Sequence, residues 1–433
     1  MKPAVEVDVL VRSRREAEGS EPDGDDYGGI GTERNESSSA FRSRPFVVFM
    51  AGCSLAWTGD WMDLASLNWA VLSLTDSAFA LGVINACRLL PIFALSLPAG
   101  VLADRFDRRR LLIGLQCGTM SLTLVLGLLT ASHGPFWVFA TCVTFRSVFE
   151  AMATPVRNAL FPNYVPRAAL ASAVAVQAAS MNLARVIGPA IAGVLLTSIR
   201  IEHIFWINSL FSLAAILGTL LAARHKTEDS SERETKTRGG LREAFSYVAK
   251  DRSVQSLLIL AVVPMVFGFP YSALMPFFAR DLLGLGPSGF GTLLSVTAAG
   301  ALVGSVWLSM GQTGRGQGRR LVLAVISFGV SLLLFSISRS LPVAAVMMFL
   351  VGLSGQLYRT SSRIALQRQV PDALRGRILS LALMDRGLIP LGTLMLSLLA
   401  EPLGAMGTVV VMGGGCAMLT LILLVVRPQI WSL

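Results

Sequence analysis

Apolar runs of about twenty residues alternate with short polar segments along most of the chain. An α-helix rises about 1.5 Å per residue, so roughly twenty residues cross the hydrocarbon core of a bilayer. The pattern therefore predicts an all-α polytopic membrane protein with twelve membrane-spanning helices. Their expected limits are 46–72, 79–102, 111–131, 136–156, 176–199, 204–224, 255–279, 288–310, 321–338, 342–362, 377–399 and 406–426.

Composition supports this fold class. Hydrophobic residues make up 53% of the 433 residues and charged residues only 15%, which is too little polar surface to coat a water-soluble protein of this size. The net charge of +10 would suggest a nucleic-acid partner in a soluble protein. We expect no such partner, because the basic residues cluster in loops between apolar runs and no known nucleic-acid-binding motif is present. The cysteines show neither disulfide nor metal-ligand spacing, so we expect no metal.

The loops predict the orientation of the chain. Lys and Arg accumulate in alternate connections by a ratio of about seven to one, and the sparse set holds only Arg200, Arg280 and Arg339. Positive charge marks cytoplasmic loops, so both termini are expected in the cytoplasm.

Four regions are expected. Residues 1–44 are polar and predict a disordered cytoplasmic tail. Residues 45–224 and 255–433 each hold six spans, and residues 225–254 form a cytoplasmic linker in which Leu241, Phe245 and Val248 predict a short amphipathic helix. For residues 225–238 a solvated linker is an equal alternative. The strings Arg157-Asn158-Ala159-Leu160 and Arg363-Ile364-Ala365-Leu366 follow the fourth span of each half. This repeat predicts two bundles related by a pseudo-twofold axis, although the match is short enough to be coincidence.

Charged residues inside the spans each cost about 3 kcal/mol unless paired or hydrated. We therefore expect them to face a central cavity and to include proton-coupling groups, since desolvation favours the neutral form of a carboxylate. They are Asp60, Asp63, Arg88, Arg146, Glu150, Arg185, Asp385 and Arg386.

Depth in the membrane suggests which of these charges pair. Asp60 and Arg88 both lie about 21 Å from the inner ends of their spans, so they can meet. Arg146 and Glu150 are one helical turn apart and can form a local pair. The alternative, that such pairs are permanent contacts holding helices together, stays open, most of all for Asp60 with Arg88.

Close helix contacts are expected where small residues recur, as at Gly300 and Gly304 in span 8. Pro264, Gly268 and Pro270 weaken span 7, which makes it a candidate gate.

The loop after the second span reads Gly100-Val101-Leu102-Ala103-Asp104-Arg105-Phe106-Asp107-Arg108-Arg109-Arg110. It resembles the signature loop between helices 2 and 3 of the major facilitator superfamily, with Asp107 in place of the usual glycine. The resemblance implies a gating role for Gly100, Asp104, Arg105, Arg108 and Arg109, with Asp104 near Arg377 at the inner end of span 11. It also implies that Arg146 corresponds to an arginine used in proton coupling, although Phe149 and Glu150 replace the usual glutamine and glycine.

The segment from Ala184 to Gly193, with Gly188, Pro189 and Gly193, resembles the fifth-helix motif of the superfamily's antiporters. Gly59-Asp60-Trp61 and Val370-Pro371-Asp372 are similar to the branch of the enterobactin exporter and macrolide efflux proteins. The resemblance implies a proton-driven exporter of a small, largely apolar compound, such as an antibiotic or siderophore.

Such an exporter is expected to act as a monomer in the cell membrane, using the proton gradient and neither ATP nor another cofactor. Two alternatives stay open: an importer on the same fold and, from a different class, a membrane-embedded enzyme. The second is disfavoured because no nucleophile elbow or His/Glu metal cluster is visible in the sequence.

Overall fold

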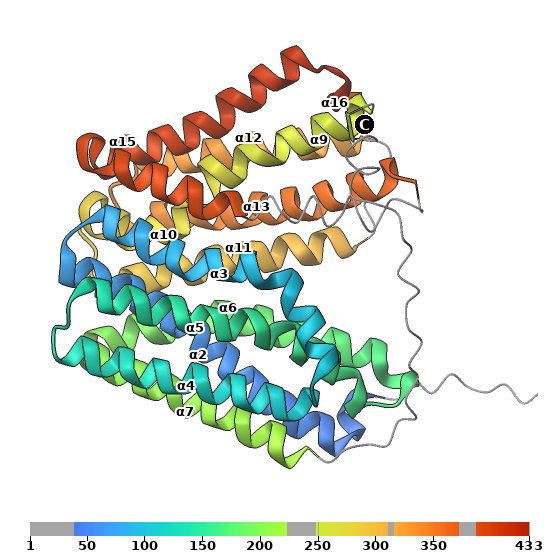
Figure 1. Ribbon diagram of the computed structural model, residues 1–433. Helices are drawn as coiled ribbons and strands as arrows, with labels where there is room; N and C mark the ends of the chain where they lie inside the picture. Colours follow the sequence, from blue (N-terminus) through green and yellow to red (C-terminus); the bar gives the residue numbers. More distant parts are fainter. Residues whose placement is uncertain (1–38, 223–247, 250, 311–315, 372–386, 433) are drawn as a thin grey trace, which may run out of the picture. The chain divides into compact units, whose positions relative to one another are not determined.

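The computed structural model of the chain describes residues 39–222, 248–249, 251–310, 316–371 and 387–432 (Figure 1). These residues form helices and the turns between them, and no strand occurs among them. The described residues belong to one compact unit.

The first half begins with a short 3-10 helix, η1 (Ala40–Arg42). Six long helices follow, α2 (Arg44–Thr75), α3 (Ala78–Arg105), α4 (Arg108–Ala131), α5 (Phe136–Leu160), α6 (Leu170–Ser198) and α7 (Ile201–Leu221). Short 3-10 turns, η2 (Phe161–Tyr164) and η3 (Arg167–Ala169), join α5 to α6.

The second half begins with a segment made of α9 (Arg252–Val263), η4 (Pro264–Gly268), α10 (Tyr271–Phe277) and η5 (Phe278–Leu282). It continues with α11 (Pro287–Ser309), α12 (Gln317–Ser336), α13 (Leu341–Gln369), α15 (Leu388–Val426) and the short α16 (Gln429–Ser432). Both η4 and η5 are π-helical turns. The interruption that Pro264 and Gly268 predict in span 7 is therefore present at η4.

Local chemistry sets several helix ends. Asp76 ends α2 in the left-handed conformation, with φ of 50°, and Ser77 then accepts a hydrogen bond from the Ala80 N–H at the start of α3. Asp107 caps α4 in the same way by accepting from the Arg110 N–H at 2.9 Å. Side-chain oxygens at these positions satisfy N–H groups that have no partner within the helix.

The number of spans is only partly settled by the described residues. Ten of their helices are long and apolar enough to cross a membrane. The helix α2, which carries the predicted span 46–72, is not among the ten. The predicted spans 377–399 and 406–426 meet in α15, which breaks at Gly404, where φ is 67° and ψ is −178°. Only glycine adopts this conformation readily, and Figure 1 shows two arms of α15 meeting at the break. The count of twelve stays a prediction.

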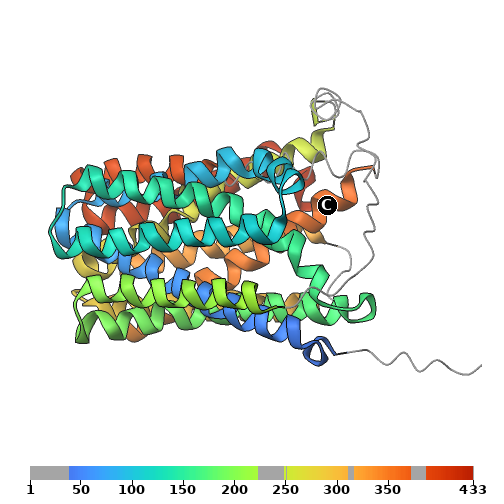
Figure 2. The ribbon, with the colours of Figure 1, turned by 60° about the horizontal axis from the view of Figure 1, so that its bottom comes forward.

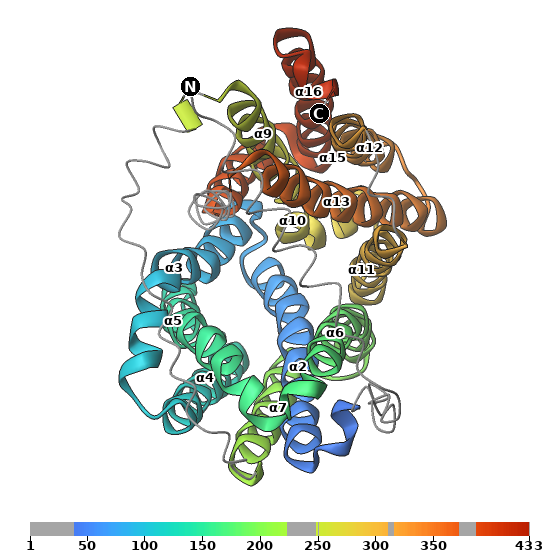
Figure 3. The same cartoon turned by 90° about the vertical axis from the view of Figure 1, so that its right-hand side faces the viewer.

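Helices of each half pack mainly with one another, as the end-on view in Figure 3 shows. In the first half α2 lies against α6 and α7, and α3 against α5; in the second half α13 lies against α11 and α12. As predicted, Gly300 brings α11 close to α13: a Cβ there would lie 2.9 Å from the Phe349 carbonyl carbon.

Helix α6 packs against α11 and α3 against α15 across the halves, and α10 also contacts α2 and α3. At the first contact, a Cβ on Gly193 would lie 3.0 Å from the Gly291 Cα. An ion pair of 2.6 Å between Asp76, after α2, and Arg280 of η5 connects the halves at the α2–α3 turn, which lies at one end of the long helices (Figure 2). The contact of α3 with α15 reaches further, since a Cβ on Gly387 would lie 2.8 Å from the ring of Phe93 in the middle of α3.

Two sequence expectations fall mostly outside the described residues. The linker helix predicted around Leu241 and Phe245 lies outside the described residues, apart from Val248 and Ala249. Most of the predicted tail also lies outside them. Its last residues are described: η1 is helical, Ala40 is fully buried, and its N–H donates to the Ser172 hydroxyl at 3.2 Å.

Candidate functional site

A cavity of about 640 Å³ lies between the two halves, lined by residues of α2, α3 and α6 on one side and of α9 to α11, α13 and α15 on the other. Apolar and aromatic side chains make up most of its wall, including Trp61, Phe269, Tyr271 and Tyr358. The charged lining residues that the structure describes are Arg88, Arg185, Arg359 and Arg363. Size and lining match those of small-molecule sites, which are mostly apolar with a few polar groups.

Two of these arginines lie over aromatic rings. The guanidinium carbon of Arg185 is 5.0 Å from the centre of the Trp61 ring, and that of Arg359 is 3.9 Å from the centre of the Phe269 ring. Both distances are in the range of cation–π contacts. The first contact joins α6 to α2, and the second joins α13 to the turn between η4 and α10.

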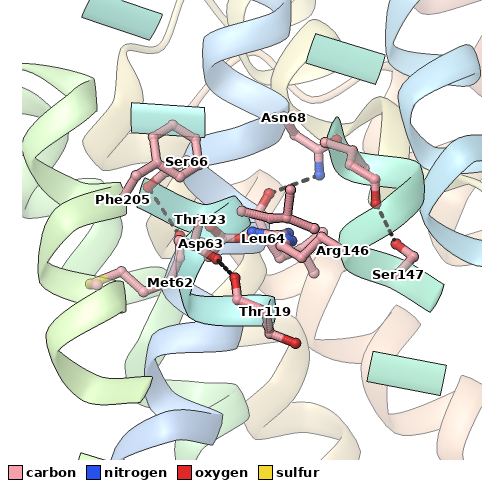
Figure 4. Close-up of polar contacts among 12 residues, drawn as sticks. Met62, Asp63, Leu64, Ser66, Asn68, Thr119, Thr123, Arg146, Ser147 and Phe205 are labelled. Carbon is pink, nitrogen blue, oxygen red and sulfur yellow. Dashed lines mark hydrogen bonds and ion pairs between the residues drawn. The ribbon is translucent and has the colours of Figure 1, made fainter. Parts of the chain in front are cut away.

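A buried ion pair lies in the first half. The Arg146 Nη2 of α5 donates to the Asp63 Oδ2 of α2 at 2.6 Å, and the two side chains are only 10% and 4% exposed. Figure 4 shows the two side chains meeting, with Thr119 and Thr123 of α4 in the same region. The other carboxylate oxygen, Asp63 Oδ1, is buried and has no hydrogen-bond partner among the described residues.

A second ion pair lies nearby. Glu150 and Arg157, both on α5, approach to 3.7 Å, and the Arg157 guanidinium lies 5.9 Å from the centre of the Trp57 ring. Asp60 of α2 is within electrostatic reach of both pairs. It forms no ion pair with any residue that the structure describes. The cluster, which we call the acid cluster, consists of Asp60, Asp63, Glu150, Arg146 and Arg157.

The predicted placement of the charged residues is only partly correct. Arg88 and Arg185 line the cavity, but Asp60, Asp63, Arg146 and Glu150 do not. Trp61 and Leu64 are the α2 residues in the wall, and successive helical residues are rotated by about 100°, so Asp60 and Asp63 lie on a neighbouring face.

Both predicted pairings are wrong. Asp60 and Arg88 form no ion pair, and Arg146 binds Asp63 while Glu150 lies nearer Arg157. Depth gives the height of a residue but not the direction in which its side chain points, so it could not separate these possibilities. Asp385 and Arg386 lie outside the described residues.

The basic loop after α3 is held at the end of α7. Arg109 donates from Nε to the Thr219 carbonyl at 3.1 Å and from Nη2 to the Leu220 carbonyl, both in the last turn of α7. A cation there satisfies carbonyls without helical partners and complements the helix dipole. Asp107, which replaces the family's usual glycine, is the cap of α4. Arg108 is the first residue of α4. Gly100, Asp104 and Arg105 belong to the last part of α3. Arg377 lies outside the described residues.

The antiporter-like motif lies at two helix contacts. A Cβ on Gly188 would lie 2.6 Å from the Trp61 Cβ, so this glycine allows α6 to approach α2. Gly193 allows α6 to approach α11 of the other half, and Pro189 lines the cavity. The motif therefore connects the cavity wall with the contact between the halves.

Sequence reasoning missed several cavity residues. Arg359 falls within the predicted span 342–362, yet it was not among the charges singled out there. Arg363 was assigned to a loop, whereas α13 continues to Gln369. A search for charged residues in the last turns of each span would have found both. Tyr271 and Tyr358 carry no signal that separates them from ordinary core residues. Among the described residues, no group of three or more His, Cys, Asp or Glu side chains is arranged to hold a metal ion.

Comparison with known proteins decides the family. The sequence profile of the family described as transmembrane secretion effector, a group of major facilitator transporters, matches residues 36–432. The chain belongs to this family. It is 30% identical over 376 residues to the staphyloferrin A transporter of Staphylococcus aureus (strain NCTC 8325 / PS 47), covering 86% of this chain and 94% of that protein. It is 25% identical to macrolide efflux protein A of Streptococcus pyogenes, covering 80% of this chain and 89% of the relative.

Solved structures agree on the fold. The nucleoside transporter NupG superimposes with a TM-score of 0.71 at 12% identity, covering 90% of this chain and all of NupG (100%). At that identity the likeness shows the major facilitator fold alone. The protein is thus a multi-pass membrane transporter of the major facilitator superfamily, and its relatives are named for efflux and for a siderophore.

Proposed function

We propose that this transporter exports a small organic compound from the cytoplasm across the cell membrane in exchange for protons, with both termini in the cytoplasm. The two halves would rock about the cavity between them and open it to one side at a time. The proton gradient would supply the energy without ATP or another cofactor. Support comes from the cavity that residues of both halves line.

The observation that carries the proposal is the position of Asp60 in the acid cluster. The other two carboxylates each have an ion-pair partner, Asp63 with Arg146 and Glu150 with Arg157. Asp60 forms no ion pair with any residue that the structure describes, although both of these pairs and Arg88 are within electrostatic reach of it. A carboxylate without a fixed counter-charge can bind and release a proton without first breaking an ion pair. Asp60 is therefore the group that we assign as the proton carrier.

Asp60 is also placed to pass its charge state to the cavity. Its neighbour in the chain, Trp61, lines the cavity, lies under the Arg185 guanidinium and packs against Gly188 of α6. A change of charge at Asp60 alters the forces on α2 next to this contact. The same helix pair leads to Gly193 and the contact with α11. Proton binding and the closure of the halves would be coupled through α2 and α6.

The direction of transport rests on the antiporter-like motif and on the relatives named for efflux. An importer on the same fold is the alternative. Deleting the gene in a cell that makes the compound distinguishes them, since loss of an exporter raises the amount of compound inside the cell and loss of an importer does not.

Proton exchange can be tested in proteoliposomes that contain a trapped pH-sensitive dye. Adding 5-carboxyfluorescein as the probe compound is expected to drive proton movement in the opposite direction with the wild type. Asp60→Asn is expected to lose this proton movement. Glu401→Gln, which removes an exposed acid of α15 outside the cluster, serves as the control and is expected to keep it. Proton movement that is normal in Asp60→Asn would reject the assignment of the carrier.

A further inference from the structure

The charges in the cavity wall are all of one sign. The charged lining residues that the structure describes are arginines, and no Asp or Glu occurs among the described lining residues. Asp385, which was expected in this region, lies outside them. Positive groups that share a low-dielectric site repel one another and are costly to bury. A cavity lined in this way needs a negative partner.

The carboxylates of the first half do not supply that partner. Asp63 and Glu150 pair with Arg146 and Arg157 in the acid cluster, and neither acid lines the cavity. Arg88 and Arg185 form no ion pair with any carboxylate that the structure describes. Both are only partly buried and face the space between the halves. Asp60, Asp63 and Glu150 act on Arg88 only from a distance. A bound anion would supply the direct contact that neither Arg88 nor Arg185 makes with a described carboxylate.

The arginines are distributed over both halves of the protein. Arg88 belongs to α3 and Arg185 to α6, whereas Arg359 and Arg363 lie one turn apart on α13. An anion with two or more negative groups can therefore contact both halves at once. The Arg185 guanidinium carbon lies 5.0 Å from the centre of the Trp61 ring, and a guanidinium can bind a carboxylate with two parallel hydrogen bonds.

The rest of the wall requires an organic body on the anion. Trp61, Phe269, Tyr271 and Tyr358 surround the arginines, and the volume of about 640 Å³ is in the range of pockets for small organic ligands. A small inorganic anion would leave these rings without contacts. An uncharged or cationic compound would leave Arg88 and Arg185 without a directly bound carboxylate among the described residues.

We propose that the compound carried by this transporter is an amphipathic organic polyanion, with two or more carboxylate groups on an apolar or aromatic body. This inference rests on the proposed function and replaces the largely apolar compound that the sequence favoured. Arg88 and Arg185 on one side and Arg363 on the other bind the carboxylates. The aromatic side chains bind the body.

Two dyes that share a xanthene ring system but differ in charge provide the test. The polyanion 5-carboxyfluorescein and the cation rhodamine 123 are titrated with purified protein, and binding is followed by fluorescence anisotropy. The wild type is expected to bind carboxyfluorescein much more tightly than rhodamine 123. Arg88→Gln, Arg185→Gln and Arg363→Gln are each expected to weaken carboxyfluorescein binding by about tenfold, which is typical for one lost hydrogen-bonded charge contact.

Matched variants distinguish the effect of a lost positive charge on binding from an effect on folding. Arg88→Lys and Arg185→Lys keep the positive charge and are expected to retain more affinity than the glutamine variants. Arg339→Gln removes an exposed arginine in the turn between α12 and α13, outside the cavity, and is expected to bind like the wild type. Preference for rhodamine 123, absence of binding by either dye, or wild-type affinity in all three glutamine variants would overturn the inference.

Transport is measured separately with the same dyes in proteoliposomes. If the arginine variants weaken carboxyfluorescein binding but the wild type does not transport the dye, the polyanion site stands and the proposed export is rejected. Export of rhodamine 123 in preference to carboxyfluorescein would leave export intact and overturn the polyanion site.

Discussion

The first prediction compares two ion pairs that have the same length but differ in burial. Asp63 with Arg146 and Asp76 with Arg280 are both joined at 2.6 Å, but the Asp63 side chain is 4% exposed and the Asp76 side chain 80%. Asp63→Asn removes the counter-charge of Arg146 and leaves a buried guanidinium unpaired, which costs about 3 to 5 kcal/mol. Asp76→Asn breaks a pair in water, where the loss is at most about 1 kcal/mol.

The assay is thermal unfolding of the purified protein in detergent, with all variants heated at one scan rate because unfolding of such proteins is often irreversible. Asp63→Asn is expected to unfold several degrees below Asp76→Asn. The double variant Asp63→Leu with Arg146→Met removes both charges and is expected to recover most of the lost stability, since apolar replacements of a buried pair are often neutral. It should not recover proton-coupled transport. If Asp63→Asn and Asp76→Asn unfolded at the same temperature, the buried pair would not have the role that its geometry indicates.

Two further predictions concern the contact between the halves and the basic loop. Gly193→Leu inserts a side chain where even a Cβ would lie 3.0 Å from the Gly291 Cα, so it is expected to separate α6 from α11 and abolish transport in proteoliposomes. Gly414→Ala, at a site with no atom within 4 Å, is the control and should keep transport. Normal transport by Gly193→Leu would refute a need for this contact. Asp107→Ala removes the cap of α4 and is expected to lower the free energy of unfolding by about 1 kcal/mol, seen as a lower unfolding temperature. Asp107→Gly, which restores the family's usual residue, is expected to lower it by only a few tenths of a kcal/mol. Equal losses of stability in the two variants would show that helix capping is not the reason for Asp107.

The hydrophobic pattern of the sequence predicted the helices well, because a stretch that crosses a bilayer must be both long and apolar. Its limits differ from the structure mainly where polar residues continue a helix beyond the membrane. The helix α13 runs on to Gln369, past the predicted limit at 362, and for that reason Arg363 was assigned to a loop. The break at Gly404 was correctly placed between two spans, since glycine and proline interrupt the apolar pattern there.

The pairing of the charged residues was harder to predict. Asp63 lies about twelve residues from the end of α2 at Thr75, and Arg146 about ten from the start of α5 at Phe136, so both are roughly 15 to 18 Å from the same face. Depth measured from that face is compatible with the Asp63–Arg146 pair as well as with the predicted pair of Asp60 and Arg88. The choice between them depends on how far each helix is rotated about its axis, which tertiary packing decides and the sequence pattern of a nearly uniformly apolar helix does not record.

The nature of the cavity was also beyond the sequence pattern. Arg88, Arg185 and Arg363 are far apart in the chain, and only the packing of the two halves brings them to one wall. From the sequence alone, Arg88 and Arg185 are isolated charges within spans and Arg363 is a loop residue. Together they change the expected compound from apolar to anionic.

The central claim is that protonation of Asp60 drives export. It is tested most directly by the steady-state accumulation of 5-carboxyfluorescein in proteoliposomes under a gradient of one pH unit, with the membrane potential held at zero. One proton exchanged per compound predicts a concentration ratio approaching about ten, because one pH unit corresponds to 1.36 kcal/mol. The wild type is expected to approach this ratio and Asp60→Asn to stay near one. Equal accumulation by both, or accumulation that does not follow the pH gradient, would contradict the account.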